Sequence, residues 1–310
     1  MTGQLVGFND EIVDATFLSQ SVQTDSLLAL ATNSSIIRVY SSSTLDARLL
    51  SGHSDIVLCL DKGAGGCLLA SGSKDRSGRI WAPSPGNTEK SWCWGCVAVC
   101  EGHAESVGAV AMFRATDEEI CRGRFMFTGS QDRTIKMWDL SGVPFAYKRD
   151  GEVVKCKSLI THKAHDKDIN SLDVAPNDRL LASGSQDRTA KVYEIEYIPS
   201  SGDKAVRGDL KLLGTCRGHK RGVWCVRFGR TERVLATGSG DKTVKLWSLD
   251  DYSCVKTFEG HTNSVLKVDF FNSGMQIVSA ASDGLVKVWN VREEQCVATM
   301  DNHDDKVSNS

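Results

Sequence analysis

One pattern recurs five times along the chain and constrains the fold more than any other feature. Each copy has a small residue followed by a histidine, then a Gly-Ser-x-Asp string or its Ala-Ala-Ser-Asp equivalent, then a closing aromatic residue. In four copies 28 residues separate the histidine from the aromatic, and the copy from 103 to 138 carries 7 more. Such self-similarity at a fixed spacing indicates an array of equivalent structural units. The small residue and histidine pairs are Gly52-His53, Gly102-His103, Ala164-His165, Gly218-His219 and Gly260-His261.

Within each copy, apolar and polar side chains alternate, which is the period of a β-strand. Val244 and Leu246, for example, flank Lys245. The Gly, Ser and Asp of the central string are typical of a tight turn between two strands. Pro is rare, with 5 in 310 residues, and no segment keeps a helical period over two capped turns. The sequence therefore predicts an all-β fold.

Composition excludes several other classes of protein. With 41% hydrophobic and 25% charged residues, a chain of 310 residues can bury a sizeable core. The net charge of -2 gives no overall basic field, so we expect any nucleic-acid contact to be local. No apolar run reaches the length of a membrane helix, the start lacks a secretory signal, and the 11 irregularly spaced cysteines favour reduced thiols over a disulfide scaffold. We expect an intracellular protein without a membrane partner.

A spacing of roughly 40 to 45 residues, with Gly-His near the start and an aromatic-polar pair near the end, resembles the WD-repeat family across nearly the whole chain. The resemblance implies a single β-propeller domain over residues 1–310, in which each blade is a four-stranded sheet. The first blade is degenerate, because Ser34 replaces the turn aspartate, no histidine precedes it, and it closes on Tyr40. The expected blade repeats are 7–40, 52–82, 102–140, 164–195, 218–249 and 260–291, and 302–310 starts a further blade.

The number of blades is one short of the family's usual seven. Connections of 22, 27 and 26 residues, against 13 or 14 elsewhere, take up the length that another blade would need. The sequence therefore predicts six recognisable blades plus the start of a seventh. We expect either a fragment or incomplete gene product, because an open propeller leaves unpaired strand edges, or a six-bladed variant.

In this family a histidine, a Ser or Thr, an Asp and a Trp form a hydrogen-bonded tetrad in each blade, and the resemblance implies the same here. A buried imidazole and carboxylate are tolerated when they bond to each other, which gives the set a structural role. The residue types also fit a catalytic triad, but a nucleophile is needed once and this set recurs, so we predict no catalytic residue. The expected tetrads are His53, Ser71, Asp75 and Trp81; His103, Thr128, Asp132 and Trp138; His165, Ser183, Asp187 and Tyr193; His219, Thr237, Asp241 and Trp247; and His261, Ser279, Asp283 and Trp289.

Two faces follow from this arrangement. We expect the histidine loops and Asp turns to share one face, which we call the trimmed face because its loops carry no insertions. The insertions at 82–91, 115–124, 141–158 and 197–209 are expected on the other face. Basic residues gather on the trimmed face, where they either pair with carboxylates, stay solvated, or form a ring that accepts an acidic or phosphorylated peptide or an RNA phosphate. The candidate partner-binding residues are Arg76, Arg133, Arg188, Lys242, Lys220, Arg221 and Trp224.

A cysteine-rich stretch, 91–103, resembles a metal or redox site. Cys93, Cys96, Cys100 and His103 have spacings that suit zinc, and a Cys-x-x-Cys pair suits thiol exchange. The repeat, however, assigns His103 to a tetrad, and Cys96 and Cys100 follow the period of an outer strand. We therefore expect no metal and no cofactor, with Cys93 and Cys96 left as a possible pair on a loop.

Further strings, among them "HDKDINSLDVAPNDRLLASGSQDRTAKVY" and "GHKRGVWCVRF", go beyond the generic repeat, because their His-Asp-Lys-Asp-Ile-Asn and Arg-Gly-Val-Trp-Cys-Val segments are not dictated by blade geometry. They resemble the second propeller of the two-propeller WD-repeat proteins of the small-subunit processome. The resemblance implies a nuclear and nucleolar scaffold in pre-ribosomal RNA processing, with sister WD-repeat proteins as partners, local contact with RNA, and no small-molecule substrate. The alternative is a substrate receptor of a ubiquitin ligase that reads acidic or phosphorylated motifs.

Overall fold

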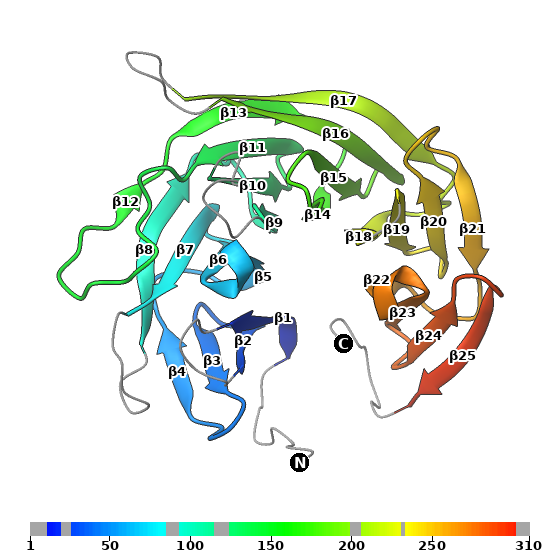
Figure 1. Cartoon of the computed structure of the whole chain (residues 1–310), viewed down its shortest axis with the longest axis horizontal. Helices are drawn as coiled ribbons and strands as arrows, with labels where there is room; N and C mark the ends of the chain where they lie inside the picture. Colours follow the sequence, from blue (N-terminus) through cyan, green and yellow to red (C-terminus); the bar gives the residue numbers. More distant parts are fainter. Residues whose placement is uncertain are drawn as a thin grey trace.

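The computed structural model describes residues 11–19, 26–84, 93–114, 124–198, 206–230 and 233–301. In these residues 25 strands form six sheets arranged around a common centre, and each sheet is a blade (Figure 1). The described part contains two short 3-10 turns, η1 (Ala64–Gly66) and η2 (Asn272–Gly274), and no α-helix. None of these helical segments is long and apolar enough to span a membrane. The predicted all-β propeller is confirmed.

Each blade runs from an inner strand at the centre to an outer strand at the circumference. Blade 1 contains β1 (Ile12–Ser19), β2 (Ser26–Thr32), β3 (Ile37–Ser41) and β4 (Ala47–Leu50). Blade 2 contains β5 (Val57–Gly63), β6 (Leu68–Ser73), β7 (Ser77–Pro83) and β8 (Trp94–Glu101). Blade 3 contains β9 (Val107–Met112), β10 (Phe125–Ser130), β11 (Thr134–Asp139) and β13 (Ser158–Lys163).

The other three blades repeat this order. Blade 4 contains β14 (Ile169–Val174), β15 (Leu180–Ser185), β16 (Thr189–Ile198) and β17 (Arg207–Arg217). Blade 5 contains β18 (Val223–Phe228), β19 (Val234–Ser239), β20 (Val244–Ser248) and β21 (Cys254–Phe258). Blade 6 contains β22 (Val265–Phe271), β23 (Gln276–Ala281), β24 (Val286–Asn290) and β25 (Gln295–Met300). The outer strand of each blade follows the closing aromatic, and the expected seventh unit, 302–310, lies outside the described residues.

The degenerate first blade has the same four strands as its neighbours. Tyr40 pairs with Leu28, as Trp81 pairs with Leu69 in blade 2. This blade has no tetrad histidine, and the buried Leu30 stands where the other blades have the tetrad Ser or Thr. An apolar side chain thus replaces the polar network in this blade.

The glycine of the Gly-Ser string lies within a strand and not in the turn that the sequence suggested. Gly129 is the last residue but one of β10, and a Cβ placed on it would come within 2.7 Å of Cγ2 of Ile169 on the next blade's inner strand. At Gly184 the corresponding distance, to Cγ1 of Val223, is 2.8 Å. Distances this short leave no space for a side chain. The repeat therefore keeps glycine here because neighbouring sheets approach very closely.

Carboxylates on the inner strands tie each blade to the next. Oδ2 of Asp61 accepts a hydrogen bond from the Met112 amide of blade 3 at 2.8 Å, and Oδ2 of Asp173 accepts one from the Phe228 amide of blade 5 at 2.8 Å. Arg114 joins the two carboxylates, with Nη1 2.9 Å from Asp61 Oδ1 and Nη2 2.8 Å from Asp173 Oδ1. Burial would lower the pKa of Arg114, but these carboxylates outweigh it and raise that pKa. A single guanidinium therefore connects blades 2, 3 and 4.

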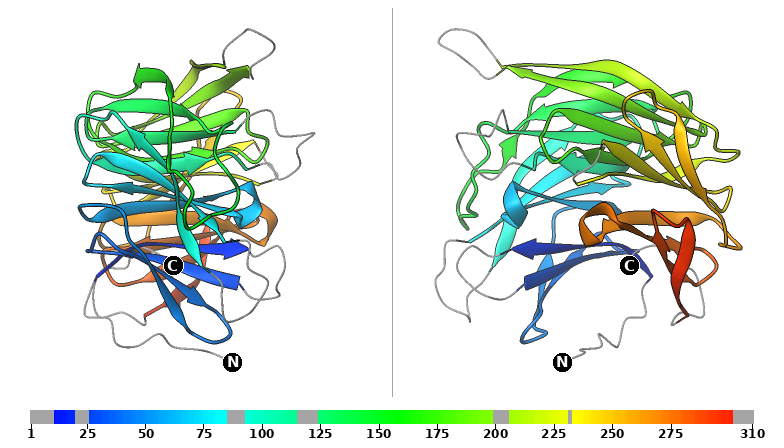
Figure 2. Two further views of the ribbon diagram at one scale, coloured as in Figure 1. Left: turned by 90° about the vertical axis from the view of Figure 1, so that its left-hand side faces the viewer. Right: turned by 45° about the vertical axis from the view of Figure 1, so that its right-hand side comes forward.

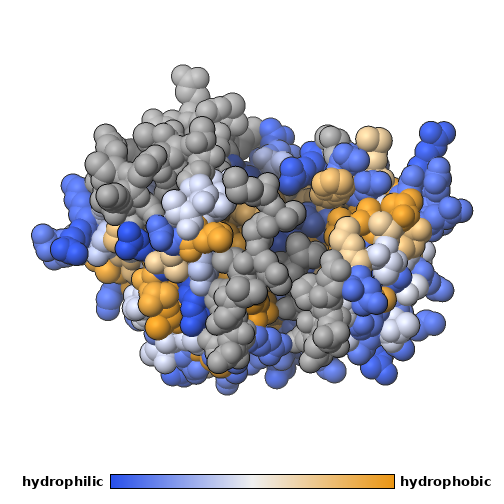
Figure 3. All heavy atoms as spheres, turned by 90° about the horizontal axis from the view of Figure 1, so that it is seen from below, coloured by the Kyte–Doolittle hydropathy of each residue, from blue (hydrophilic) through white to orange (hydrophobic). Residues whose placement is uncertain are grey.

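The first and last blades are joined differently. Packing along the inner strands is much sparser between β22 and β1 than at the other five junctions, and Nζ of Lys267 bonds Oδ1 of Asp14 across it at 3.1 Å. The first strand, β1, and the last strand, β25, lie on this side (Figure 2). Figure 3 shows the molecule from this side, where patches of apolar residues interrupt the hydrophilic surface. Exposed apolar residues of these two blades are Ile12, Phe17, Leu45, Leu49, Phe271, Met275, Val297 and Met300.

The sequence predicts that the insertion at 141–158 lies on one face of the ring, but the structure shows that it does not stay there. It runs along the circumference, where β12 (Val154–Lys155) adds a parallel fifth strand to blade 2 beside Ala98 and Val99 of β8. Tyr147 of the same segment packs against Gly95. The insertion therefore covers an outer edge that would otherwise be free to pair. The central parts of the other three insertions lie outside the described residues.

Replacing Arg114 by methionine tests the link between blades. We expect the free energy of unfolding in urea to fall by about 3 kcal/mol, because the change removes the cation paired with the buried Asp61 and leaves Asp173 to Arg227, whose Nη1 is 3.5 Å away. The matched control is Arg233→Met, whose ion pair with Asp250 is exposed on both sides, and it should change stability by less than about 0.5 kcal/mol. Equal losses in the two variants would contradict this account.

Candidate functional site

The structure brings each predicted tetrad of blades 2, 3, 5 and 6 together. In blade 5, Nδ1 of His219 lies 2.9 Å from Asp241 Oδ2, and Nε2 lies 2.7 Å from Oγ1 of Thr237. The indole of Trp247 donates to the same Oγ1 at 2.8 Å. Because an ionised carboxylate can only accept, Nδ1 carries a proton and donates it to Asp241. The four side chains thus form one continuous chain of hydrogen bonds.

The other complete tetrads repeat these distances. The histidine to aspartate contact is 2.7 Å for His53 and Asp75, 2.8 Å for His103 and Asp132, and 2.9 Å for His261 and Asp283. The histidine to hydroxyl contact is 2.8 Å for His53 and Ser71, 2.7 Å for His103 and Thr128, and 2.7 Å for His261 and Ser279. Donation from the indole is 2.8 Å for Trp81 and Trp138 and 2.7 Å for Trp289.

In blade 4 the tetrad lacks its last bond. His165 contacts Asp187 and Ser183 at 2.8 and 2.7 Å, but the hydroxyl of the fully buried Tyr193 has no hydrogen-bond partner among the described residues. The phenol ring packs instead against the imidazole of His162, with ring centroids 5.4 Å apart. Tyr193 therefore fills the space of the tryptophan without replacing its donor.

This difference between blades 4 and 5 gives a matched pair of variants. Tyr193→Phe should leave the free energy of unfolding unchanged or raise it by up to about 1 kcal/mol, since it removes a buried hydroxyl without a partner. Trp247→Phe should lower it by about 2 to 3 kcal/mol, because it removes a donor to Thr237 and leaves a cavity. Urea denaturation measures both, and a larger loss for Tyr193→Phe than for Trp247→Phe would refute the assignment.

The hydroxyls of the tetrads are poorly placed for nucleophilic chemistry. Ser71, Ser183 and Ser279 have no solvent exposure. In blades 2 and 6 the serine oxygen already accepts the indole N–H. An attacking oxygen must reach a substrate, so these Ser-His-Asp sets act as structural networks.

The tetrad carboxyls are held in their ionised form. Burial would raise the pKa of Asp75, Asp132, Asp187 and Asp241, but hydrogen bonds from the histidine and from the turn hydroxyl outweigh it and hold each pKa well below its ordinary value. For Asp241 that hydroxyl is Oγ1 of Thr243, at 2.7 Å. Each of these carboxyls therefore binds a proton more weakly in the folded chain than in the unfolded one.

These shifts predict an acid transition of known sign. A carboxyl whose pKa is depressed by folding adds stability above its unfolded pKa, about 3.9, and this stability is lost as pH falls toward the folded pKa. We expect the urea midpoint to fall steeply as the pH drops below about 4. In Asp241→Asn the fall should be less steep, because one such group is gone. Parallel curves for the two proteins would contradict the prediction.

The basic residues that follow the turn aspartates are all exposed. They lie on the trimmed face, which carries the histidine loops and the Asp turns and is called the histidine face from here on. Their backbones have positive φ, from 68° at Arg76 to 73° at Lys242, whereas blade 6 has Gly284 at φ 81°. A side chain at such an angle costs about 1 kcal/mol relative to glycine. Within the described ranges their side chains form no ion pair or hydrogen bond. These residues are Arg76, Arg133, Arg188 and Lys242.

The other three candidates come from the loop between blades 4 and 5 and from the start of β18. Lys220 and Arg221 are exposed, and the Lys220 amide donates to Asp241 Oδ2 at 2.9 Å. Trp224 is half-buried, and its Nε1 would lie 3.3 Å from a Cβ on Gly240, which would also touch Arg221. The loop and the start of β18 thus place the Trp224 indole and two cations beside the centre of the propeller.

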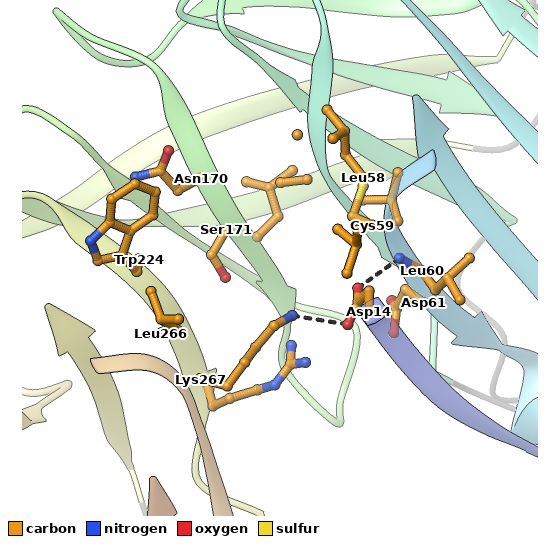
Figure 4. Close-up of a pocket in the computed structure, with 16 residues that line it drawn as sticks. Asp14, Leu58, Cys59, Leu60, Asp61, Asn170, Ser171, Trp224, Leu266 and Lys267 are labelled. Atoms are coloured by element: carbon orange, nitrogen blue, oxygen red, sulfur yellow. Dashed lines mark hydrogen bonds and ion pairs between the residues drawn. The ribbon is translucent and has the colours of Figure 1, made fainter. Parts of the chain in front are cut away.

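Trp224 also lines a central cavity of about 230 Å³ (Figure 4). Lys267 and Asp14 form an ion pair there, and Asp14 accepts the Leu60 amide at 2.8 Å. Asn170 lies beside Trp224 in the same view. Charged groups from the first and last blades therefore meet in this cavity.

Sequence reasoning missed the inner-strand charges, although the repeat carries a signal for them. Asp61, Asp173 and Asp269 stand eight residues after their histidines, and Arg227 occupies the same position in blade 5. Asp61 and Asp173 are buried against the next blade, whereas Asp269 is exposed. A charged residue that recurs on the apolar side of a strand indicates a contact between blades.

The cysteine stretch is an outer strand, β8. Both ring nitrogens of His103 are used in its tetrad. Cys96 lies opposite Trp81 at an irregularity in the pairing of β7 and β8, and its Sγ donates to the Ala98 carbonyl at 3.5 Å. Cys93, the exposed residue just before this strand, donates to the carbonyl of Trp94 at 3.7 Å. In the part of the chain that the structure describes, no three His, Cys, Asp or Glu residues group to hold a metal.

The same irregularity recurs in other blades with the same kind of side chain. Cys254 lies opposite Trp247 and Cys296 opposite Trp289, and each thiol donates to the carbonyl two residues later, at 3.4 and 3.2 Å. In blade 3 the position is Ser158, whose hydroxyl makes the equivalent bond at 3.0 Å. At this position a small side chain that donates a hydrogen bond therefore satisfies a backbone carbonyl where the pairing of the outer strand is irregular.

Comparison with known proteins agrees with this architecture. Transducin beta-like protein 3 of Mus musculus is 44% identical over 227 residues, which are 73% of this chain and 25% of that protein. U3 small nucleolar RNA-associated protein 13 of Saccharomyces cerevisiae is 35% identical over 237 residues, 73% of this chain and 26% of that protein. The Ribosome biogenesis protein WDR12 homolog of Drosophila mojavensis is 29% identical over 153 residues, 48% and 33% of the two chains. The chain thus spans about a quarter of the length of the first two.

A family model described as "WD domain, G-beta repeat" matches residues 46–82, 94–139, 156–194, 210–248 and 252–290. These ranges cover more than half of the chain and end at or just after the closing aromatic of each tetrad. The chain belongs to the WD-repeat family.

Proposed function

We propose that this chain is a non-catalytic interaction scaffold of the small-subunit processome, acting in pre-ribosomal RNA processing and small-subunit assembly. It works in the nucleus and nucleolus, where it binds sister WD-repeat proteins and makes local contact with RNA. The observation that carries the proposal is the 44% identity to transducin beta-like protein 3. The printed names of the yeast and Drosophila relatives, which refer to U3 small nucleolar RNA and to ribosome biogenesis, support it.

The geometry supports a binding role over an enzymatic one. The polar side chains that recur in every tetrad bind one another inside the blades, so they hold the ring together and do not face a substrate. The basic residues of the histidine face, in contrast, are exposed and have no partner in the described part of the chain. On a rigid ring such residues fit the role of contacts for an anionic partner.

Reversing two of these charges tests the proposal. The double variant Arg133→Glu, Arg188→Glu should lose capture of processome proteins and precursor ribosomal RNA from nuclear extract, because charge-assisted bonds become repulsive. The melting temperature should stay the same, since both side chains are exposed and unpaired within the described ranges. Affinity purification with mass spectrometry and RNA quantification gives the readout.

The control is Arg233→Glu, an exposed change at the strand-turn junction of blade 5. It should capture the same set as the unchanged protein. Recovery of ubiquitin-ligase adaptors in place of processome components would overturn the proposal and favour a substrate receptor. Full capture by the double variant would remove Arg133 and Arg188 from the interface.

A further inference from the structure

The charge of the histidine face is not evenly distributed around the ring. In blades 2, 3 and 4 the loop after each histidine carries acidic side chains next to the basic turn residues. Asp55 accompanies Arg76 and Glu105 accompanies Arg133, and both acids are exposed. The acidic residues of the blade 4 loop are Asp166 and Asp168. Opposite charges on neighbouring segments weaken the attraction of an anion from solution, so this face is close to neutral in blades 2 and 3 and at the blade 4 loop that carries His165.

Between blades 4 and 5 the balance changes. The end of β17 and the loop that carries His219 have three exposed cations, Arg217, Lys220 and Arg221, and no acid. Arg217 pairs with Thr189, next to the Arg188 turn of blade 4, and Lys242 follows the turn aspartate of blade 5. We name this group the blade 4–5 patch, with members Arg188, Arg217, Lys220, Arg221 and Lys242.

Contacts in the structure hold the patch together. A Cβ on Gly222 would lie 2.9 Å from Oε1 of Gln186, so the blade 5 loop abuts the turn of blade 4. Gly240, in the turn that ends at Lys242, approaches the Cβ of Arg221 to 3.4 Å by the same measure. The loop and both turns are therefore neighbours. None of the five cationic side chains forms an ion pair or hydrogen bond within the ranges that the structure describes.

Trp224 adds an aromatic surface to these cations. It is half-buried at the border of the patch and lines the central cavity, where Figure 4 shows it beside Asn170. Its indole N–H has no hydrogen-bond partner among the described residues. An unpaired donor and an apolar ring next to a cation group suit a ligand that has an anionic group and a neighbouring side chain.

The surroundings of the patch limit how long the ligand can be. Asp166 and Asp168 lie on the blade 4 side, and Glu259 follows β21 on the blade 6 side. A nucleic-acid strand has a phosphate at every residue, so a strand that extended beyond the patch would be repelled on both sides. A short peptide can keep its charges within the two blades. The charge pattern therefore favours a peptide over RNA.

We propose that the blade 4–5 patch binds a short acidic or phosphorylated peptide, with the anionic groups on Arg188, Lys220 and Arg221 and a neighbouring apolar side chain against Trp224. This deepens the proposed function and rests on it, since it names the partner class of the histidine face. It also narrows the site from a ring over four blades to one junction.

Fluorescence anisotropy with the full chain tests the proposal. The probes are a short labelled peptide with two phosphoserines beside a leucine, its unphosphorylated alanine counterpart, and a single-stranded oligouridylate of equal charge. We expect the phosphopeptide to bind about tenfold more tightly than either other probe, because each charge-assisted bond to phosphate is worth about that factor. Lys220→Glu, Arg221→Glu should weaken it by about a hundredfold, and Trp224→Ala by about tenfold.

The matched control is the double variant Lys74→Glu, Arg76→Glu, which reverses two exposed charges of the same face in blade 2. It should change affinity by less than about twofold, since it lies outside the patch. Equal loss in this control would overturn the localisation, because the basic residues of several blades would then contribute alike. Tighter binding of oligouridylate would overturn the peptide assignment, and no binding of any probe would overturn the site. Processome capture in the last case would show that the proposed function stands without it.

Discussion

The close approach of neighbouring sheets is the constraint on which the rest of this structure depends. At Gly129 and Gly184 the next blade's inner strand occupies the space of a side chain. Water is excluded from so tight a junction, so every polar group inside it needs a partner. The amide of Phe228 finds one in the carboxylate of Asp173 on the blade before it. The tetrads solve the same problem within a blade, where His219 and Asp241 satisfy each other.

What the sequence could predict follows from how far each interaction extends. The tetrad of His219, Thr237, Asp241 and Trp247 lies within one repeat, so its spacing recurs and can be recognised. Strand order within a blade is local for the same reason. The parallel addition of β12 to blade 2 could not be predicted, because it depends on where an insertion of blade 3 meets its neighbour's edge. A single repeat carries no information about such contacts.

Arg114 is a second contact between blades that a single repeat could not predict. It lies at the end of the inner strand in the copy with 7 extra residues, where Ala111 stands in the position of the recurring aspartate. Its two partners, Asp61 and Asp173, are contributed by the blades on either side. Pattern matching sees Arg114 as a departure from the repeat. In the ring, it supplies the cation that two buried carboxylates need.

The exposed basic turn residues call for a different argument, because nothing in the packing requires them. Gly284 shows that the turn is made without a side chain, and a non-glycine residue at positive φ costs about 1 kcal/mol. Arg76 and Arg133 bear that cost next to acidic neighbours that cancel their field. Arg188 and Lys242 bear it in a group with no such neighbour in the intervening loop. Stability does not distinguish these two environments, so the unbalanced charge between blades 4 and 5 is the feature on which the proposed peptide site rests.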